Sequence, residues 1–228
     1  MQRHDSFRFD GLRVPVEIRG EGSPLVFLPG LGVHPRYYDE GISRLSKHFT
    51  VFVPDLSFRT HADLPDQVER YRALSEDLAA HYAPEAVRAG HSFGGFLALL
   101  GSVPAIALSP LIPLAVGWSR KFGRAVRLQA REYVGLEGNR GAGWAWSILR
   151  DYLGTAIRRP ASLFPTVSET LHCLADRFRP TAPLAHVILA EYDRLYHPRE
   201  SESFLAGAAR DQVVVRRVRR GHGWPVTH

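Results

Sequence analysis

Apolar residues change their spacing repeatedly along the chain, from short continuous runs to a helical period and back. Runs 24–32 and 49–56 show no alternation of apolar and polar residues, which predicts strands buried on both faces. Segment 64–82 places its apolar residues on one helical face and predicts a crossover helix. This alternation predicts an α/β fold with a mostly parallel sheet and helices on both of its faces. The other predicted strands are 86–91, 103–110, part of 184–198 and 212–218, and the other predicted helices are 36–48, 93–101 and 200–211.

Two segments depart from this alternation. Residues 8–20 carry two β-prone runs around Asp10-Gly11, a dipeptide that supplies the positive φ angles of a tight turn, so we expect an antiparallel hairpin there. Residues 111–180 mix aromatic residues with arginines and with Gly or Pro breaks, which predicts a helical insertion. We therefore divide the chain into this insertion and an α/β core made of 1–110 and 181–228.

The composition predicts a soluble globular protein. Of the 228 residues, 45% are hydrophobic and 23% are charged, which is enough apolar material for a sizeable core. The only cysteine, Cys173, cannot form an internal disulfide, and no group of Cys and His has metal-ligand spacing. The N-terminal segment lacks the apolar core of a secretory signal, and no apolar run reaches the roughly 18 residues of a membrane span. We expect a cytoplasmic protein without a membrane span or a metal, and the sequence carries no signal for an oligomeric state.

The positive charge raises the question of nucleic-acid binding. The formal net charge is +6 and the pI is about 9.8, and four arginines fall within 216–220. However, only two of the 29 basic residues are lysine, so arginine is favoured along the whole chain. No helix-turn-helix, zinc-finger or aromatic-basic pattern accompanies the charge. We therefore expect a small-molecule substrate and not nucleic acid as the partner.

A serine lies in a glycine-rich segment between the strand predicted at 86–91 and the helix predicted at 93–101. A serine hydroxyl is a weak nucleophile that needs exposure, a nearby base and donors for the developing negative charge. A sharp turn from a strand into a helix meets these needs, and it requires glycine two positions before and after the serine. Gly90 and Gly94 occupy these positions around Ser92. Ser92 is therefore a candidate nucleophile, the alternative being a glycine-rich turn with an incidental serine.

With this motif the chain resembles the α/β-hydrolase family along nearly its whole length. Gly-His-Ser-Phe-Gly-Gly at 90–95 is similar to the nucleophile elbow of that family, segment 28–32 to its oxyanion loop, and Asp55-Leu56 to the landmark after the next strand. The resemblance implies an α/β-hydrolase fold in which 111–180 forms a helical cap over the active site. A serine nucleophile argues against the haloalkane dehalogenase and epoxide hydrolase branches, which use a carboxylate there.

The resemblance also implies the order serine, acid, histidine, with the acid after a late strand and the histidine near the C-terminus. Asp193 follows the strand predicted within 184–198, and His222 lies between two glycines after the last strand. These two residues would complete a triad with Ser92. The alternatives are Glu191 and Asp211 for the acid and His197 and His228 for the base, and His91 is expected to be a packing residue.

The resemblance implies a mechanism and a reaction class. His222 takes the proton of Ser92 as the serine attacks a carbonyl carbon, and Asp193 orients the imidazole. The backbone N–H groups of Leu31 and Phe93 hold the oxyanion. An acyl-enzyme forms and is released by water, without a metal or an organic cofactor. The predicted function is hydrolysis of carboxylic esters or related acyl bonds of a small, partly apolar substrate.

Substrate contacts are predicted at His34, beside the oxyanion loop, and at Trp118, Trp144 and Trp146 in the insertion. The alternative for most aromatic residues of the insertion is that they form its own core. Because cap residues set specificity, thioesters, lactones, amides, C–C bonds and acyl transfer stay open. A different class of function also stays open, namely a small-ligand sensor on the same fold without turnover.

Two features depart from the family pattern. The family often carries glycines and a serine after the Asp-Leu landmark, whereas residues 57–65 of this chain read Ser-Phe-Arg-Thr-His-Ala-Asp-Leu-Pro and contain no glycine. Arg88 lies inside the strand predicted at 86–91, which is normally central and apolar. Burying a lone guanidinium is costly, so either the strand is shorter than predicted, or Arg88 reaches a carboxylate or the surface.

Overall fold

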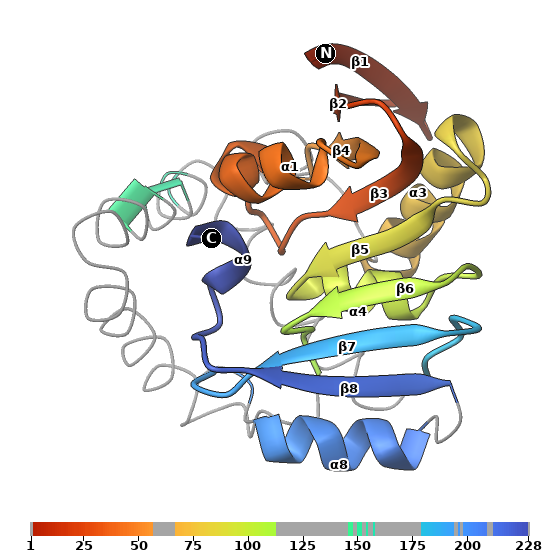
Figure 1. Ribbon diagram of the computed structural model, residues 1–228. Coiled ribbons are helices and arrows are strands. Elements are labelled where there is room, and N and C mark those ends of the chain that lie inside the picture. The colour runs from red at the N-terminus through yellow and green to blue at the C-terminus, as the bar shows by residue number, and fades with distance from the viewer. Residues whose placement is uncertain are drawn as a thin grey trace.

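A single sheet organises the described part of the chain. In the computed structural model the described residues are 2–56, 67–112, 146–147, 150–151, 154, 157, 179–193, 196, 198–208 and 212–227. The strands are β1 Gln2–Phe9, β2 Leu12–Arg19, β3 Ser23–Leu28, β4 Phe49–Pro54, β5 Val87–His91, β6 Ala105–Leu108, β7 Ala185–Ala190 and β8 Val213–Val218. They form an eight-stranded sheet in the order β1-β2-β4-β3-β5-β6-β7-β8 (Figure 1). Pairing is antiparallel from β1 to β4 through β2 and parallel from β4 to β8, which confirms the mostly parallel sheet.

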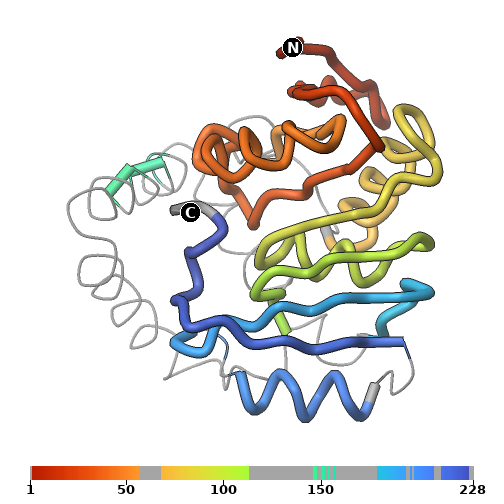
Figure 2. The backbone as a smooth tube through the Cα atoms, in the orientation of Figure 1, coloured from red at the N-terminus to blue at the C-terminus, as the bar shows by residue number. Residues whose placement is uncertain are grey.

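The N-terminal hairpin forms at the predicted dipeptide. Asp10 has a φ of 47° and Gly11 a φ of 79°, and Phe9 pairs with Leu12 across the turn. A two-residue turn with positive φ at both central positions matches the twist of the strands on either side. Figure 2 shows this hairpin at one end of the sheet, whereas the C-terminal segment returns to the carboxyl ends of the central strands.

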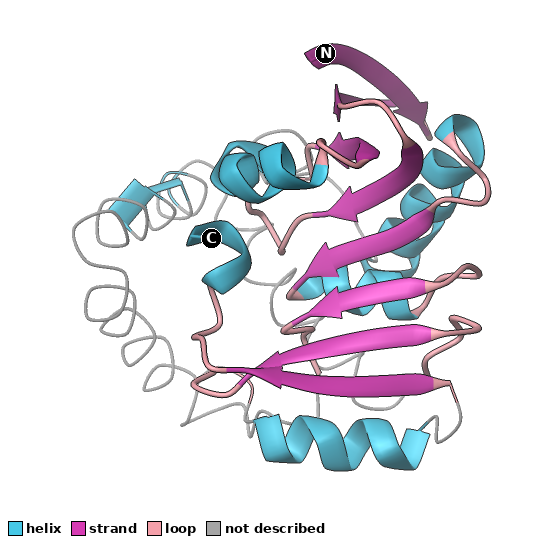
Figure 3. Cartoon of the chain, in the orientation of Figure 1, coloured by secondary structure: helices cyan, strands magenta, loops and turns pink. Residues whose placement is uncertain are grey.

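Helices cover both faces of this sheet (Figure 3). They are η1 Pro35–Tyr38, α1 Asp39–Leu45, α3 Gln67–Tyr82, α4 Phe93–Leu99, α8 Pro198–Ala208 and the short α9 Trp224–Thr227, which the sequence analysis did not predict. One buried cluster joins Val26 and Leu28 of β3 to α3 and α4, and the other joins Leu25 and Phe27 of β3 to α1. Since successive side chains of a strand point to opposite faces, the two clusters lie on opposite sides of the sheet. No described helix is long and apolar enough to cross a membrane.

Most of the predicted insertion, 111–180, lies outside the described residues, and so do Trp118, Trp144 and the whole of the loop 57–65. The division into core and cap therefore stays a prediction. Among the described residues of the insertion, Asp151 contacts the core through its carboxylate, which accepts hydrogen bonds of 2.8 Å from both the Arg36 guanidinium and the Tyr37 hydroxyl.

Arg88 is buried in β5 and pairs with a carboxylate. Its side chain is 2% exposed, and both of its terminal nitrogens donate to Glu76 of α3, one of them at 2.6 Å. The Ser102 hydroxyl donates to the same carboxylate at 3.0 Å. A Cβ at Gly101 would lie 2.5 Å from the guanidinium, so the glycine leaves the space that the arginine occupies. Of the alternatives for Arg88, the carboxylate partner is the one observed.

Replacing Glu76 by glutamine should destabilise the fold by about 2–3 kcal/mol at pH 7, because it leaves the buried Arg88 charge without its counter-ion. The hydrogen bond from Arg88 lowers the pKa of Glu76 below its ordinary value of 4.5. A lowered folded pKa means that the ion pair stabilises the fold above the unfolded pKa and that this contribution is lost as the pH falls through the folded pKa. Urea unfolding across this pH range measures the effect.

The matched control is Glu69→Gln on the same helix, since Glu69 makes an exposed ion pair with Arg72. An exposed pair contributes at most about 0.5 kcal/mol. Equal losses in the two variants, or a Glu76→Gln deficit that does not shrink at acid pH, would contradict the role assigned to the buried pair.

Candidate active site

Ser92 occupies a sharp turn between β5 and α4. Its φ of 54° and ψ of −116° are rare for a residue with a side chain. A Cβ at Gly90 would lie 2.3 Å from the Gly94 backbone, and a Cβ at Gly94 would lie 2.0 Å from the Leu28 carbonyl oxygen. Strand, turn and helix therefore approach too closely for side chains at these two positions, as the motif predicts.

Three backbone hydrogen bonds hold this strained turn. The Ser92 N–H donates to the Leu108 carbonyl at 3.0 Å, and the Ser92 carbonyl accepts from the N–H groups of Phe96 at 3.0 Å and Leu111 at 2.9 Å. Ser92 is half-buried. Phe93 is the first residue of α4, where N–H groups have no partner within the helix and the helix dipole favours negative charge.

Asp193 and His222 form a buried pair. The Nδ1 atom of His222 lies 2.7 Å from the Oδ2 atom of Asp193, and the two residues are 5% and 6% exposed. The Oδ1 atom of Asp193 accepts the Tyr196 N–H at 2.8 Å, which fixes the orientation of the carboxylate. Because a carboxylate only accepts, Nδ1 of His222 donates, and Nε2 of the neutral ring is left as the basic atom.

The three predicted catalytic residues follow parallel strands at the same edge of the sheet. Ser92 follows β5, Asp193 follows β7 and His222 follows β8. His91, next to Ser92, lies against the histidine loop, with its ring centroid 4.9 Å from that of His222. The elbow and the loop of His222 are therefore neighbours in space, at the carboxyl ends where open α/β sheets bind ligands.

The alternative catalytic residues are placed as follows. Glu191 is exposed, and its carboxylate lies 3.7 Å from the Arg219 guanidinium. Asp193, and not Glu191, is therefore the acid bonded to His222. His197, Asp211 and His228 lie outside the described residues.

His34 caps the short helix η1 beside the oxyanion loop. Its Nδ1 atom accepts the Arg36 N–H at 3.1 Å, and its Nε2 atom lies 3.5 Å from the Asp55 carboxylate. This places His34 between the loop after β3 and the end of β4. Leu31 in the same loop is half-buried and packs against the main core. Contacts of His34 with substrate and of the Leu31 N–H with an oxyanion stay predictions, as does a substrate contact of Trp146, which is 64% exposed.

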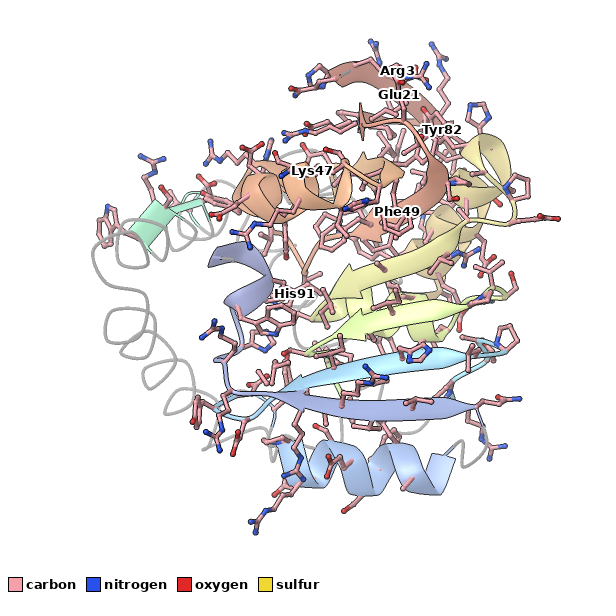
Figure 4. All side chains as sticks on the ribbon, viewed as in Figure 1. Arg3, Glu21, Lys47, Phe49, Tyr82 and His91 are labelled. Carbon is pink, nitrogen blue, oxygen red and sulfur yellow. The ribbon has the colours of Figure 1, made fainter. Side chains whose placement is uncertain are left out.

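His91 does more than the packing expected from the sequence. It is 4% exposed, its Nδ1 atom lies 2.8 Å from the Tyr38 hydroxyl, and its Nε2 atom lies 2.9 Å from the His222 carbonyl oxygen. Figure 4 labels it at the carboxyl end of β5, beside the C-terminal segment. Burial, and secondarily the charge of His222, hold the pKa of His91 well below its usual 6.5. The ring is therefore neutral at pH 7.

Tyr38 and Tyr196 belong to this site, although no sequence motif marks either residue. Tyr38 lies in the helix predicted at 36–48, and Tyr196 lies in the segment 184–198 with its ring centroid 5.2 Å from that of His222. A tyrosine contributes in the same way to a hydrophobic pattern whether or not its hydroxyl forms a hydrogen bond. Among the described residues, no cluster of three or more His, Cys, Asp or Glu is placed to hold a metal ion.

Comparison with known proteins decides the family. The sequence profile of the Alpha/beta hydrolase family matches residues 25–228. The chain belongs to the alpha/beta hydrolase family. The family match confirms the resemblance that the elbow motif indicated. It also confirms the predicted fold class and the prediction that the chain is a hydrolase.

The individual proteins that resemble this α/β hydrolase share only a short segment or a small fraction of its sequence. It is 37% identical over 94 residues to a Mycobacterium phage D29 protein that is provisionally named a non-heme haloperoxidase, and this match covers 38% of the chain and 33% of the phage protein. The crystal structure of the N-formylmaleamic acid deformylase of Pseudomonas putida S16 has a TM-score of 0.69 at 19% identity, over 99% of this chain and 96% of that one. A Bacillus subtilis carboxylesterase has a TM-score of 0.62 at 14% identity, over 100% and 87%. At these identities the solved structures share the fold alone.

Proposed function

We propose that this α/β hydrolase cleaves carboxylic esters or related acyl bonds of a small, partly apolar molecule, with Ser92, His222 and Asp193 as its triad. The observation that carries the proposal is the buried 2.7 Å pair of His222 and Asp193. The backbone of His222 contacts His91, the residue that directly precedes the strained Ser92. A strained elbow, an oriented imidazole and a buried carboxylate are the parts that activation of a serine hydroxyl needs.

In the proposed reaction, Nε2 of His222 accepts the hydroxyl proton as Oγ of Ser92 attacks the carbonyl carbon. The N–H groups of Phe93 and Leu31 receive the oxyanion, and one such donor contributes about 3–4 kcal/mol. The tetrahedral intermediate collapses, the protonated His222 gives its proton to the leaving alcohol, and an acyl-enzyme remains. Water then loses a proton to His222 and attacks the acyl carbon. As the second tetrahedral intermediate collapses, His222 returns that proton to Oγ of Ser92, and the acid is released. No step needs a metal or an organic cofactor.

The decisive experiment is labelling with a fluorophosphonate probe, followed by mass-spectrometric mapping of the modified peptide. We expect rapid modification of Ser92 in the wild type and none in Ser92→Ala, because only an activated serine reacts quickly with this electrophile. A panel of p-nitrophenyl esters of increasing acyl length then measures the size of the acyl site. An unlabelled wild type would favour the sensor, and labelling without hydrolysis of any ester would favour acyl transfer or C–C bond cleavage.

A further inference from the structure

A chain of hydrogen bonds joins three separate parts of the site. The Gly30 N–H donates to the Tyr38 hydroxyl oxygen at 2.8 Å, that hydroxyl lies 2.8 Å from Nδ1 of His91, and Nε2 of His91 lies 2.9 Å from the carbonyl oxygen of His222. Gly30 belongs to the loop after β3, His91 directly precedes Ser92, and His222 belongs to the loop after β8. All three bonds are buried.

The chemistry of the groups fixes the direction of each bond. The His222 carbonyl can only accept, so Nε2 of His91 carries the hydrogen and donates it. In a neutral ring Nδ1 is then an acceptor, so the Tyr38 hydroxyl donates to it, and the hydroxyl oxygen accepts from Gly30. Burial keeps the His91 ring neutral, since it lowers the pKa of that residue. In this series of three hydrogen bonds every polar group therefore has a partner, and only one arrangement of the hydrogens achieves this.

We infer that Tyr38 and His91 are positioning residues, which hold the backbone of His222 and the loop of Gly30 in register with Ser92. The kinetic part of this inference rests on the proposed function. It differs from a catalytic role, because neither side chain acts on the reacting atoms. Each acts through a backbone group of a neighbouring loop.

The loop of His222 has a particular need for such an anchor. His222 lies between Gly221 and Gly223, whose backbones have more conformational freedom than those of other residues. Asp193 holds the ring of His222, but a ring held at one atom can still tilt with its backbone. The bond from His91 fixes that backbone, and it ties it to the residue next to Ser92.

The neutral state of His91 also suits this place. The proposed reaction passes a positive charge to His222, whose ring centroid is 4.9 Å from that of His91. A second positive charge at that distance would raise the energy of the imidazolium. A neutral His91 avoids the repulsion and still donates the bond that orients the loop.

Four variants separate positioning from general stability. Tyr38→Phe removes only the hydroxyl, and His91→Leu removes both hydrogen bonds of the ring. His91→Gln restores a donor, since its amide nitrogen can take the place of Nε2 and reach the His222 carbonyl. Tyr82→Phe is the control, because it removes one tyrosine hydrogen bond, to Asp5, at a distance from the site. Thermal unfolding checks that each variant is folded.

Two measurements report on the positioning. Ring ¹⁵N NMR at pH 7 should show His91 neutral with its hydrogen on Nε2, and the Nδ1–H proton of His222 should give a strongly deshielded resonance. We expect that resonance to shift or broaden in Tyr38→Phe and His91→Leu, and to stay unchanged in Tyr82→Phe. For a p-nitrophenyl ester, kcat should fall about 10- to 100-fold in the two variants while KM stays nearly constant, because a displacement of about 1 Å costs that much in rate. His91→Gln should recover part of the loss.

A His91 hydrogen on Nδ1, or a His222 resonance unaltered in both variants, would overturn the inference. So would an altered resonance with an unchanged kcat. If the wild type neither hydrolyses esters nor reacts with a fluorophosphonate, the proposed function fails. The His222 resonance alone then decides whether the hydrogen bonds of Tyr38 and His91 hold the loop of His222.

Discussion

Replacing Ser92 by alanine should lower kcat for ester hydrolysis at least about a thousand-fold, because it removes the only atom that forms the acyl-enzyme. The fold should stay intact. Alanine keeps the Cβ and thus the strain of a φ of 54°, and the backbone bonds that hold the turn do not involve the hydroxyl. Steady-state kinetics with a p-nitrophenyl ester, together with circular dichroism, measure both effects.

Ser92→Gly supplies the control for strain. Glycine adopts this backbone conformation freely, so Ser92→Gly should be more stable than Ser92→Ala by about 1 kcal/mol and equally inactive. A tenfold loss or less in Ser92→Ala would remove Ser92 from the role of nucleophile. Activity that returns in the glycine variant would show that the alanine variant fails through strain and not through the missing hydroxyl.

The elbow could be predicted from sequence because its constraint is local. A close approach of strand and helix excludes side chains at Gly90 and Gly94, and both positions are visible within five consecutive residues. The sheet could be predicted for a similar reason, since the spacing of apolar residues within each segment indicates whether that segment forms a strand or a helix. The order of serine, acid and histidine along the chain in the family then indicated Asp193 and His222, and the structure brings these two residues together.

Partners that depend on how helices and loops pack could not be predicted. Arg88 needed a carboxylate, but the choice of Glu76 depends on which side of α3 faces β5. The bond between Tyr38 and His91 joins residues 53 positions apart, and only the packing of η1 over the loop after β3 creates it. Neither a propensity nor a periodic pattern reports the direction in which a hydroxyl or a guanidinium points.

Asp193→Asn should reduce kcat about 10³- to 10⁴-fold by reversing the hydrogen-bond pattern of His222. The Tyr196 N–H donates to one carboxylate oxygen, so the amide oxygen of asparagine will keep that place. Its NH₂ group must then occupy the position 2.7 Å from Nδ1 of His222. An NH₂ group donates, which forces Nδ1 to accept and moves the ring hydrogen to Nε2. A histidine in that tautomer cannot take the proton of Ser92.

Ring ¹⁵N NMR distinguishes this cause from a simple loss of charge. In the wild type Nδ1 of His222 should carry the hydrogen at neutral pH, and in Asp193→Asn the two nitrogen shifts should exchange. Asp10→Asn is the matched control, because Asp10 lies in the exposed turn of the N-terminal hairpin and asparagine suits its positive φ. That variant should keep the wild-type rate and tautomer. An Asp193→Asn enzyme with an unchanged tautomer, or with more than a tenth of the wild-type kcat, would show that the carboxylate does not set the state of His222, and the acid of the triad would have to be another residue.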